Sequence, residues 1–188
     1  MATWRSAAVS DIGQRGTNED GYLEAPDLRL WAVADGMGGH AHGEVASRTA
    51  LHALKRAVHS GTDPAGAVAA ANAATREAAR RRGSDMGTTL VAIRLRPGAY
   101  ELAWLGDSRI YRWHGGALVQ LTTDHTVVQE WVDQGRISPE QARGHPYGHM
   151  LSRAAGLDSG AAAAAEGALR GGERFLLCSD GLTDTLDD

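Results

Sequence analysis

The stretch Trp31-Ala-Val-Ala-Asp35-Gly36-Met37-Gly38-Gly39 is an apolar run that ends at a carboxylate and passes at once into glycines. Such a run predicts a buried β-strand, and glycine after Asp35 lets the backbone approach another group closely. A second stretch, Phe175-Leu-Leu-Cys-Ser-Asp180-Gly181-Leu-Thr-Asp184, repeats the arrangement. Carboxylates at strand ends suit a hard divalent cation with oxygen ligands. Because gathered carboxylates repel one another unless a cation offsets their charge, the two stretches predict one shared metal site.

Composition limits the class of protein. A length of 188 residues with 43% hydrophobic residues predicts one domain, residues 1–188, with a sizeable core. The net charge of -4 gives no electrostatic reason to expect nucleic acid. A single cysteine, Cys178, cannot form an internal disulfide, which agrees with a reducing compartment. The sequence has neither a signal-peptide pattern at its start nor a run of roughly 20 apolar residues, so we expect a cytoplasmic protein without a membrane partner.

Strand-like and helix-like segments come in groups, which favours segregated layers over an alternating α/β fold. Hydrophobic periodicity, turn residues and capping residues define the segments. We expect strands at 4–11, 22–25, 28–34, 88–96, 100–105, 108–114, 117–121 and 174–179. We expect helices at 44–59, 64–82, 126–134 and 138–143. The alanine-rich segment 161–165 has helical propensity but glycine neighbours, and its structure is left open.

Short motifs along the chain resemble those of one family. They are Arg15-Gly-Thr-Asn-Glu19-Asp20, Val33-Ala-Asp35-Gly36-Met37-Gly38-Gly39-His40, Gly43-Glu44, Gly87-Thr88-Thr89-Leu90, Leu105-Gly-Asp107-Ser-Arg109, Leu121-Thr-Thr-Asp124-His125 and Ser179-Asp180-Gly181-Leu-Thr-Asp184. In this order they are similar to the PPM family, the type-2C metal-dependent serine/threonine protein phosphatases, in the bacterial style. The resemblance implies an α+β fold, a four-layer α-β-β-α sandwich of two antiparallel sheets flanked by helices. It also implies a helical flap at about 126–157.

The resemblance assigns roles to the acidic residues. Asp35 would bridge two Mn²⁺ or Mg²⁺ ions, the Gly36 carbonyl would help to hold one of them, and Asp180 would bind the other. Glu19 and Asp20 would ligate or orient metal-bound waters, and the resemblance assigns this role to the pair jointly.

A third, weaker metal position is implied at Asp107, Asp180 and Asp184. Arg15 would hold the substrate phosphate, because a planar guanidinium that is always charged matches phosphate geometry better than lysine does. The implied activity is hydrolysis of phosphoserine or phosphothreonine by in-line attack of a metal-bridging water, with signal transduction as the setting. Phosphorylated proteins, together with a Ser/Thr kinase that shares them, are the implied partners.

Two departures from the family pattern bear on activity. Many eukaryotic members have histidine directly after the metal-binding Asp-Gly, where this chain has Met37, so that general acid is not carried over. His40 and His42 lie nearby, and we interpret them as surface or structural residues. The family continues to a late Gly-Gly-x-Asp-Asn segment, whereas this chain stops at Asp188, so we expect it to be C-terminally incomplete. The alternative function is therefore a catalytically impaired module that binds a phosphoprotein or a kinase.

Other hydrolase classes fit the residues poorly. Cys178 lacks the arginine about six residues later that a cysteine-dependent phosphatase needs, and neither Asp35 nor Asp180 starts an Asp-x-Asp motif. The histidines between 145 and 149 are too loosely spaced to predict a zinc site from sequence. The glycine-rich segment 36–43 lacks the Lys-Ser/Thr end of a Walker loop.

Overall fold

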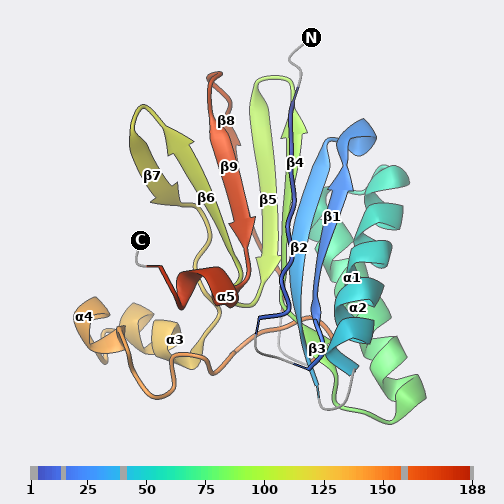
Figure 1. Ribbon diagram of the computed structural model, residues 1–188, viewed down its shortest axis with the longest axis vertical. Coiled ribbons are helices and arrows are strands. Elements are labelled where there is room, and N and C mark those ends of the chain that lie inside the picture. The colour runs from blue at the N-terminus through green and yellow to red at the C-terminus, as the bar shows by residue number, and fades with distance from the viewer. Residues whose placement is uncertain (1–3, 14–15, 39–41, 158–160, 187–188) are drawn as a thin grey trace.

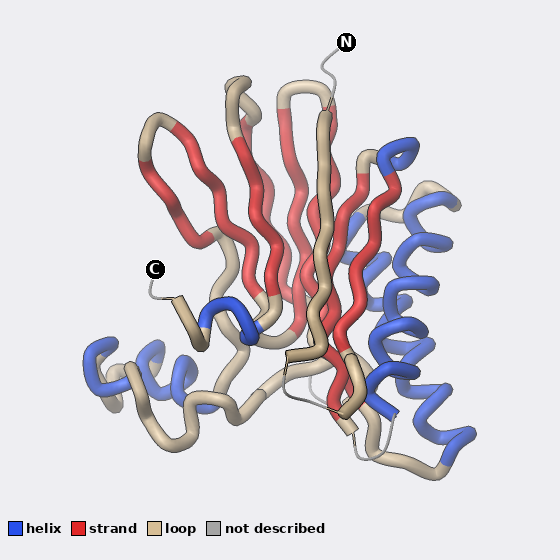
Figure 2. Tube along the Cα trace, in the orientation of Figure 1, coloured by secondary structure: helices blue, strands red, loops and turns tan. Residues whose placement is uncertain are grey.

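Two antiparallel sheets and two long helices make up most of the computed structural model, which describes residues 4–13, 16–38, 42–157 and 161–186 (Figures 1 and 2). The larger sheet contains β1 (Asp20–Ala25), β2 (Leu30–Met37), β3 (Gly87–Thr88), β4 (Leu90–Arg96), β5 (Ala99–Leu105) and β8 (Ala163–Ala168). The smaller sheet contains β6 (Arg109–His114), β7 (Ala117–Gln120) and β9 (Arg174–Cys178). The helices are η1 (Pro26–Leu28), α1 (His42–His59), α2 (Pro64–Arg82), α3 (Val127–Asp133), α4 (Pro139–Ala142) and α5 (Asp180–Thr183).

The central strands β4 and β5 of the larger sheet are buried on both faces, and alternate residues of each strand point to opposite sides. On β4, Leu90 and Ala92 pack towards α1 and α2, whereas Val91, Ile93 and Leu95 pack towards the smaller sheet. The helices therefore cover one face of the larger sheet and the smaller sheet covers the other (Figure 1). This arrangement leaves the ends of β1, β2 and β5 free to carry functional groups.

Local sequence explains where α2 begins and ends and how closely α1 packs on the sheet. The Asp63 side chain caps α2 by accepting a hydrogen bond from the Gly66 N–H at 2.8 Å, and Pro64 occupies the first turn. Gly83 ends α2 with φ of 61°, a conformation that glycine adopts at little cost. Most buried residues of α1 are small, namely Gly43, Ala46, Ser47, Ala50 and Ala53, and the larger ones include Leu54, which is 0% exposed. Small side chains let the helix lie close to the sheet.

The expected fold class is confirmed, since two antiparallel sheets are flanked by helices. The long helices α1 and α2 flank the larger sheet, and the shorter α3, α4 and α5 lie at one end of the sheets (Figure 1). Segment 126–157 contains α3 and α4, and its role as a flap stays a prediction.

One local expectation differs from the structure, and two segments that the sequence left unassigned take a definite form. Residues 4–11 were expected to form a strand, but 4–12 form none, because this exposed run joins no ladder with the described strands. Segment 161–165, left open by sequence, forms most of β8, because pairing with β5 outweighs the helical propensity of alanine. The chain also turns into helix α5 directly after Ser179, where sequence indicated no helix.

We expect Leu54→Ala to lower the free energy of unfolding by about 2–5 kcal/mol, because the substitution leaves a cavity between α1 and the sheet. Urea denaturation followed by circular dichroism measures this loss. Leu118→Ala is the matched control, because Leu118 is 49% exposed and should change stability by no more than about 0.5 kcal/mol. Equal effects of the two substitutions would contradict the packing described for α1.

Candidate metal centre

The pairing of β1 with β2 brings the first pair of carboxylates together. The antiparallel register places Asp20, the first residue of β1, opposite Asp35 near the end of β2. Directly beside this pair, the Gly36 N–H donates a hydrogen bond to the Glu19 carbonyl at 3.2 Å. Cross-strand neighbours on one face of an antiparallel pair lie about 5 Å apart, so two like charges here repel strongly.

The backbone of Asp35 is fixed by two threonines. Its N–H donates to Thr89 Oγ1 at 2.9 Å, and its carbonyl accepts from the Thr89 N–H at 2.8 Å and from Thr88 Oγ1 at 2.9 Å. Thr89 Oγ1 also hydrogen bonds with Ser108 Oγ at 2.7 Å, and both hydroxyls are buried. Buried hydroxyls with satisfied hydrogen bonds hold a rigid backbone. Thr89 is thus a positioning residue for Asp35, and only its place in the Gly-Thr-Thr-Leu motif signals this role in the sequence.

The packing around position 36 leaves no room for a side chain, so only glycine fits there. A Cβ atom on it would collide with the Gly43 carbonyl at the start of α1 and would lie 2.8 Å from the Glu19 carbonyl. The glycine therefore allows α1 and the residue before β1 to close tightly around the end of β2.

The structure separates the roles of Glu19 and Asp20, which the sequence left joined. Asp20 accepts a hydrogen bond from Ser179 Oγ at 2.8 Å, and its charge acts on Asp35. The Glu19 side chain instead lies against Gly43, where an added Cβ would be 2.6 Å from Glu19 Cδ, and its carbonyl accepts from Ser47 Oγ. Of the two, Asp20 is the residue whose carboxylate joins Asp35.

Asp180 completes the central group of carboxylates. It is the first residue of α5, directly after β9, so it reaches the site from the opposite end of the sequence. Burial raises the pKa of Asp35 to about 8, and the charges of Asp20 and Asp180 and hydrogen bonds with them add to the shift. Burial and the neighbouring carboxylates both disfavour the charged form of Asp35 when no cation is bound.

Asp107 extends the acidic region beyond Asp180. It lies between β5 and β6, and burial raises its pKa to about 6, with the charges of Asp180 and then Asp124 adding to the shift. Asp180 therefore lies between two acidic neighbours, Asp35 and Asp107. These side chains offer carboxylate oxygens, which are the ligands that Mg²⁺ and Mn²⁺ prefer, so the residues present fit divalent cations.

An ion pair that the sequence did not assign borders the acidic region. Arg109 Nε lies 3.0 and 3.1 Å from the two Asp124 carboxylate oxygens, and Nη2 lies 2.7 Å from Oδ2. Such a forked contact fixes both side chains. Next to it, burial, with a smaller effect of Arg153, lowers the pKa of His125 to about 4. The ring stacks on Trp104, so His125 is a neutral packing residue.

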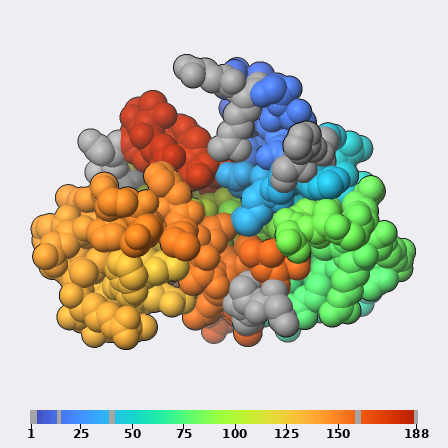
Figure 3. All heavy atoms as spheres, turned by 90° about the horizontal axis from the view of Figure 1, so that it is seen from below, coloured from blue at the N-terminus to red at the C-terminus, as the bar shows by residue number. Residues whose placement is uncertain are grey.

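A cavity of about 730 Å³ opens beside the carboxylates, between α5 and the segment that carries α3 and α4. Asp107, Arg109, Asp124, Asp180 and Asp184 line it. Seen from below, the yellow to orange segment and the red α5 region border this cavity (Figure 3). The cavity gives a bulky ligand access to the acidic groups.

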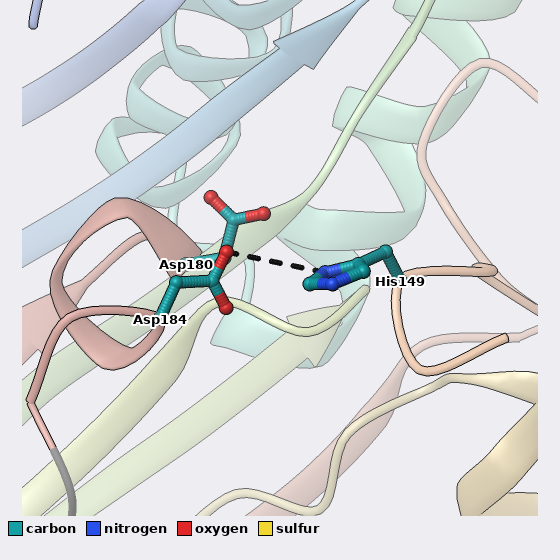
Figure 4. A group of neighbouring side chains, drawn as sticks. All are labelled: His149, Asp180 and Asp184. Carbon is teal, nitrogen blue, oxygen red and sulfur yellow. Dashed lines mark ion pairs between the residues drawn. The ribbon is translucent and has the colours of Figure 1, made fainter. Parts of the chain in front are cut away.

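His149 contributes to this cavity although sequence reasoning gave it no role. One ligand atom each of His149, Asp180 and Asp184 lies within 4.8 Å of the others (Figure 4). His149 comes from the loop after α4, and its spacing to the two aspartates in sequence carries no recognisable signal. The structure thus unites Asp20, Asp35 and Asp180, places Asp107 and Asp184 beside them, and turns the Glu19 side chain towards α1. Arg15 and His40 lie outside the described residues.

The family model for protein phosphatase 2C matches residues 10–188. The chain belongs to the protein phosphatase 2C family. It is 41% identical over 196 residues to the serine/threonine protein phosphatase PstP of Mycobacterium tuberculosis, covering 98% of this chain but only 37% of PstP. It is 33% identical to the protein phosphatase PhpP of Streptococcus pneumoniae, covering 95% of this chain and 78% of PhpP.

Solved structures of the family share the fold. The crystal structure of M. tuberculosis PstP has a TM-score of 0.84 and 41% identity, with 93% of this chain and 77% of that chain covered. The PstP catalytic domain in complex with two manganese ions has a TM-score of 0.78 and 39% identity, with 93% and 76% covered. Among the described residues, no helix is long and apolar enough to cross a membrane.

We expect Asp35→Asn to stabilise the metal-free protein increasingly as the pH rises from about 4 to 8. The Asp35 pKa is raised from 3.8 in the unfolded chain to about 8 in the fold, so the folded state binds the proton more tightly. The stability that this proton contributes is fully present below pH 4 and is lost as the pH approaches 8. Thermal unfolding in EDTA at several pH values, compared between wild type and Asp35→Asn, measures the difference.

Saturating Mn²⁺ should reverse the order of stability, because ligand binding stabilises the folded state and the variant lacks a carboxylate ligand. Asp27→Asn, which changes an exposed aspartate in η1, is the matched control and should follow the wild type at every pH. A stability difference that does not vary with pH would contradict the crowding of carboxylates around Asp35.

Proposed function

We propose that this chain is a protein serine/threonine phosphatase that hydrolyses phosphoserine and phosphothreonine with divalent cations. The convergence of Asp20, Asp35 and Asp180 from three separate segments carries the proposal. Membership of the protein phosphatase 2C family and the names of its relatives support it. Because the chain spans 37% of PstP, the activity of the longer relative comes to this chain as a proposal.

The proposed ligands follow from the positions of the side chains. Asp35, with the Gly36 carbonyl, and Asp180 would hold two Mn²⁺ or Mg²⁺ ions, and Asp20 would orient waters around them. Glu19, whose side chain lies against Gly43, would support the site through its backbone. When bound, the ions would supply a nucleophile at neutral pH and would offset charge on the phosphoryl oxygens.

The residues of the chain would then bind and orient the substrate. Arg15 is proposed to hold the phosphate, and the cavity beside Asp107 and Asp180 has room for the phosphorylated side chain and its neighbours. Thr89, through its hydrogen bonds to Asp35, would keep the carboxylate in place when the local charge changes. Rigid support of this kind lets a site stabilise developing charge without reorganising.

The three gathered carboxylates disfavour the alternative of a catalytically impaired binding module. A module without activity has no need for Asp20, Asp35 and Asp180 to remain together at a cost in repulsion, as the raised pKa of Asp35 shows. Phosphorylated proteins and a Ser/Thr kinase with shared substrates are the proposed partners. The metal preference and the number of ions belong to the same proposal.

We expect Mn²⁺-dependent release of phosphate from a phosphothreonine peptide, and a fall of about 100-fold or more in kcat/KM in Asp35→Asn. Loss of a metal ligand should cost at least as much as loss of the groups that orient ligands, which typically costs 10–100-fold. Malachite green detection of phosphate, with and without EDTA, measures the activity.

Asp27→Asn serves again as the control, because it removes an equal charge from an exposed position. Circular dichroism and bound Mn²⁺ are measured on the same samples. Absence of hydrolysis by folded, Mn²⁺-loaded wild type would reject the phosphatase proposal and favour the binding module.

A further inference from the structure

We infer that His125 is a positioning residue for the reaction, because it fixes the turn between β5 and β6 that presents Asp107 to the cavity. The same residue ties this turn to the segment that carries α3 and α4. The inference rests on the proposed function, since the cavity is the one proposed to take the phosphorylated side chain. His125 acts through the backbone of Gly106, so it contributes geometry and does not touch the substrate.

Two hydrogen bonds join His125 to Gly106. The Gly106 N–H donates to His125 Nδ1 at 3.2 Å, and the His125 N–H donates to the Gly106 carbonyl at 3.0 Å. A ring nitrogen that accepts carries no proton, so the neutral imidazole holds its proton on Nε2. Burial lowers the pKa of His125 to about 4, which keeps the ring neutral at physiological pH. Both backbone polar groups of Gly106 therefore bond to one residue.

The turn that His125 holds also rests on Thr89. Gly106 has a φ of 101°, and a Cβ atom added to it would lie 2.7 Å from Thr89 Cβ, so the two residues are in close contact. On the other side of Asp107, Ser108 Oγ hydrogen bonds with Thr89 Oγ1 at 2.7 Å. Both neighbours of Asp107 in the chain are thus held by the residue that positions Asp35.

The orientation of the His125 ring is itself fixed by its surroundings. The ring stacks on Trp104 with centroids 6.1 Å apart and planes 11° from parallel. Trp104 Nε1 donates to the Thr123 carbonyl at 2.8 Å, which holds the indole in place. A ring held in this way directs Nδ1 at the Gly106 N–H without a search among rotamers.

The backbone of His125 connects the turn to the other wall of the cavity. The His125 carbonyl accepts a hydrogen bond from the Ser152 N–H at 2.8 Å, and the next residue, Thr126, forms an isolated antiparallel bridge with Leu151. The loop after α4, which lines the cavity, therefore ends against His125. One residue thus sets the position of the Asp107 turn relative to this loop.

Two substitutions separate the acceptor from the ring. His125→Asn places an oxygen near the position of Nδ1 but gives up the stacking on Trp104. His125→Leu keeps an apolar side chain but leaves the N–H of the buried Gly106 without its acceptor, which is costly. A positioning role predicts that the asparagine variant retains more function than the leucine variant, whereas a role in packing alone predicts the opposite order.

Hydrolysis of a phosphothreonine peptide with saturating Mn²⁺ measures the effect on the reaction. We expect kcat to fall about tenfold or more in His125→Leu, with a smaller change in KM, because loss of groups that orient a site typically costs about 10–100-fold. His125→Asn should retain most of the wild-type kcat. His52→Leu, at an exposed position on α1, is the control and should match the wild type. Circular dichroism on the same samples confirms that each variant is folded.

Nuclear magnetic resonance gives two readouts that do not depend on activity. The Gly106 amide should exchange with solvent about tenfold faster or more in His125→Leu than in wild type and His125→Asn, because only the leucine variant lacks the acceptor. In the wild type, the ¹⁵N shifts of the His125 ring should identify a proton on Nε2 and none on Nδ1. This second measurement needs no variant, so it decides the matter even if His125→Leu does not fold.

A proton on Nδ1, or equal Gly106 exchange in all three proteins, would overturn the inference whether or not the chain hydrolyses the peptide. Full kcat in His125→Leu would overturn it as well, and so would a leucine variant that is more active than the asparagine variant. If folded, Mn²⁺-loaded wild type does not hydrolyse the peptide, the phosphatase proposal fails, and Gly106 exchange still shows whether His125 holds the turn. The two failures are therefore distinguishable.

Discussion

Repulsion among carboxylates is the constraint on which this end of the molecule depends. Asp20 and Asp35 lie opposite each other because β1 and β2 pair in one register, and Asp180 joins them from the start of α5. A shift of register by one residue would turn these side chains to opposite faces. The hydrogen bonds of Thr89 and the close fit of Gly36 against α1 hold the end of β2 against the repulsion.

The rest of the fold supplies that support. The long helices cover one face of the larger sheet and the smaller sheet covers the other, so β4 is buried on both sides and β2 is buried on the side of the helices. A buried, close-packed sheet deforms little, which lets strand ends carry groups that would otherwise move apart. The carboxylates of the candidate site lie where strands end. The buried interior of the sheet behind them stabilises the fold.

Much of the fold was predictable from sequence because the decisive signals are local. Asp63-Pro64 and Gly83 mark both ends of α2, and the turn at Pro97-Gly98 marks the hairpin of β4 and β5. Prediction from propensity failed where strand pairing decides the structure. The alanines of β8 form a strand against β5, and residues 4–11 pair with none of the described strands although a strand was expected there. Strand pairing depends on distant residues, which no local pattern encodes.

Part of the candidate site was likewise predictable from the sequence, and part of it was not. Asp35 and Asp180 stood out because each follows an apolar run, whereas the difference between Glu19 and Asp20 appears only in the packing against Gly43 and the hydrogen bond from Ser179. His149 and the Arg109–Asp124 pair depend on how separate loops meet around the cavity.

Asp180 belongs to two neighbouring groups of side chains, one with Asp35 and one with His149 and Asp184. Its carboxylate has two oxygens, and whatever occupies one group changes the charge and orientation that the other group meets. Cations bound at the two groups would therefore be linked through a coupling free energy that acts equally in both directions. A single residue at the start of a short helix thus makes the state of the outer loop and the state of the central carboxylates report on each other.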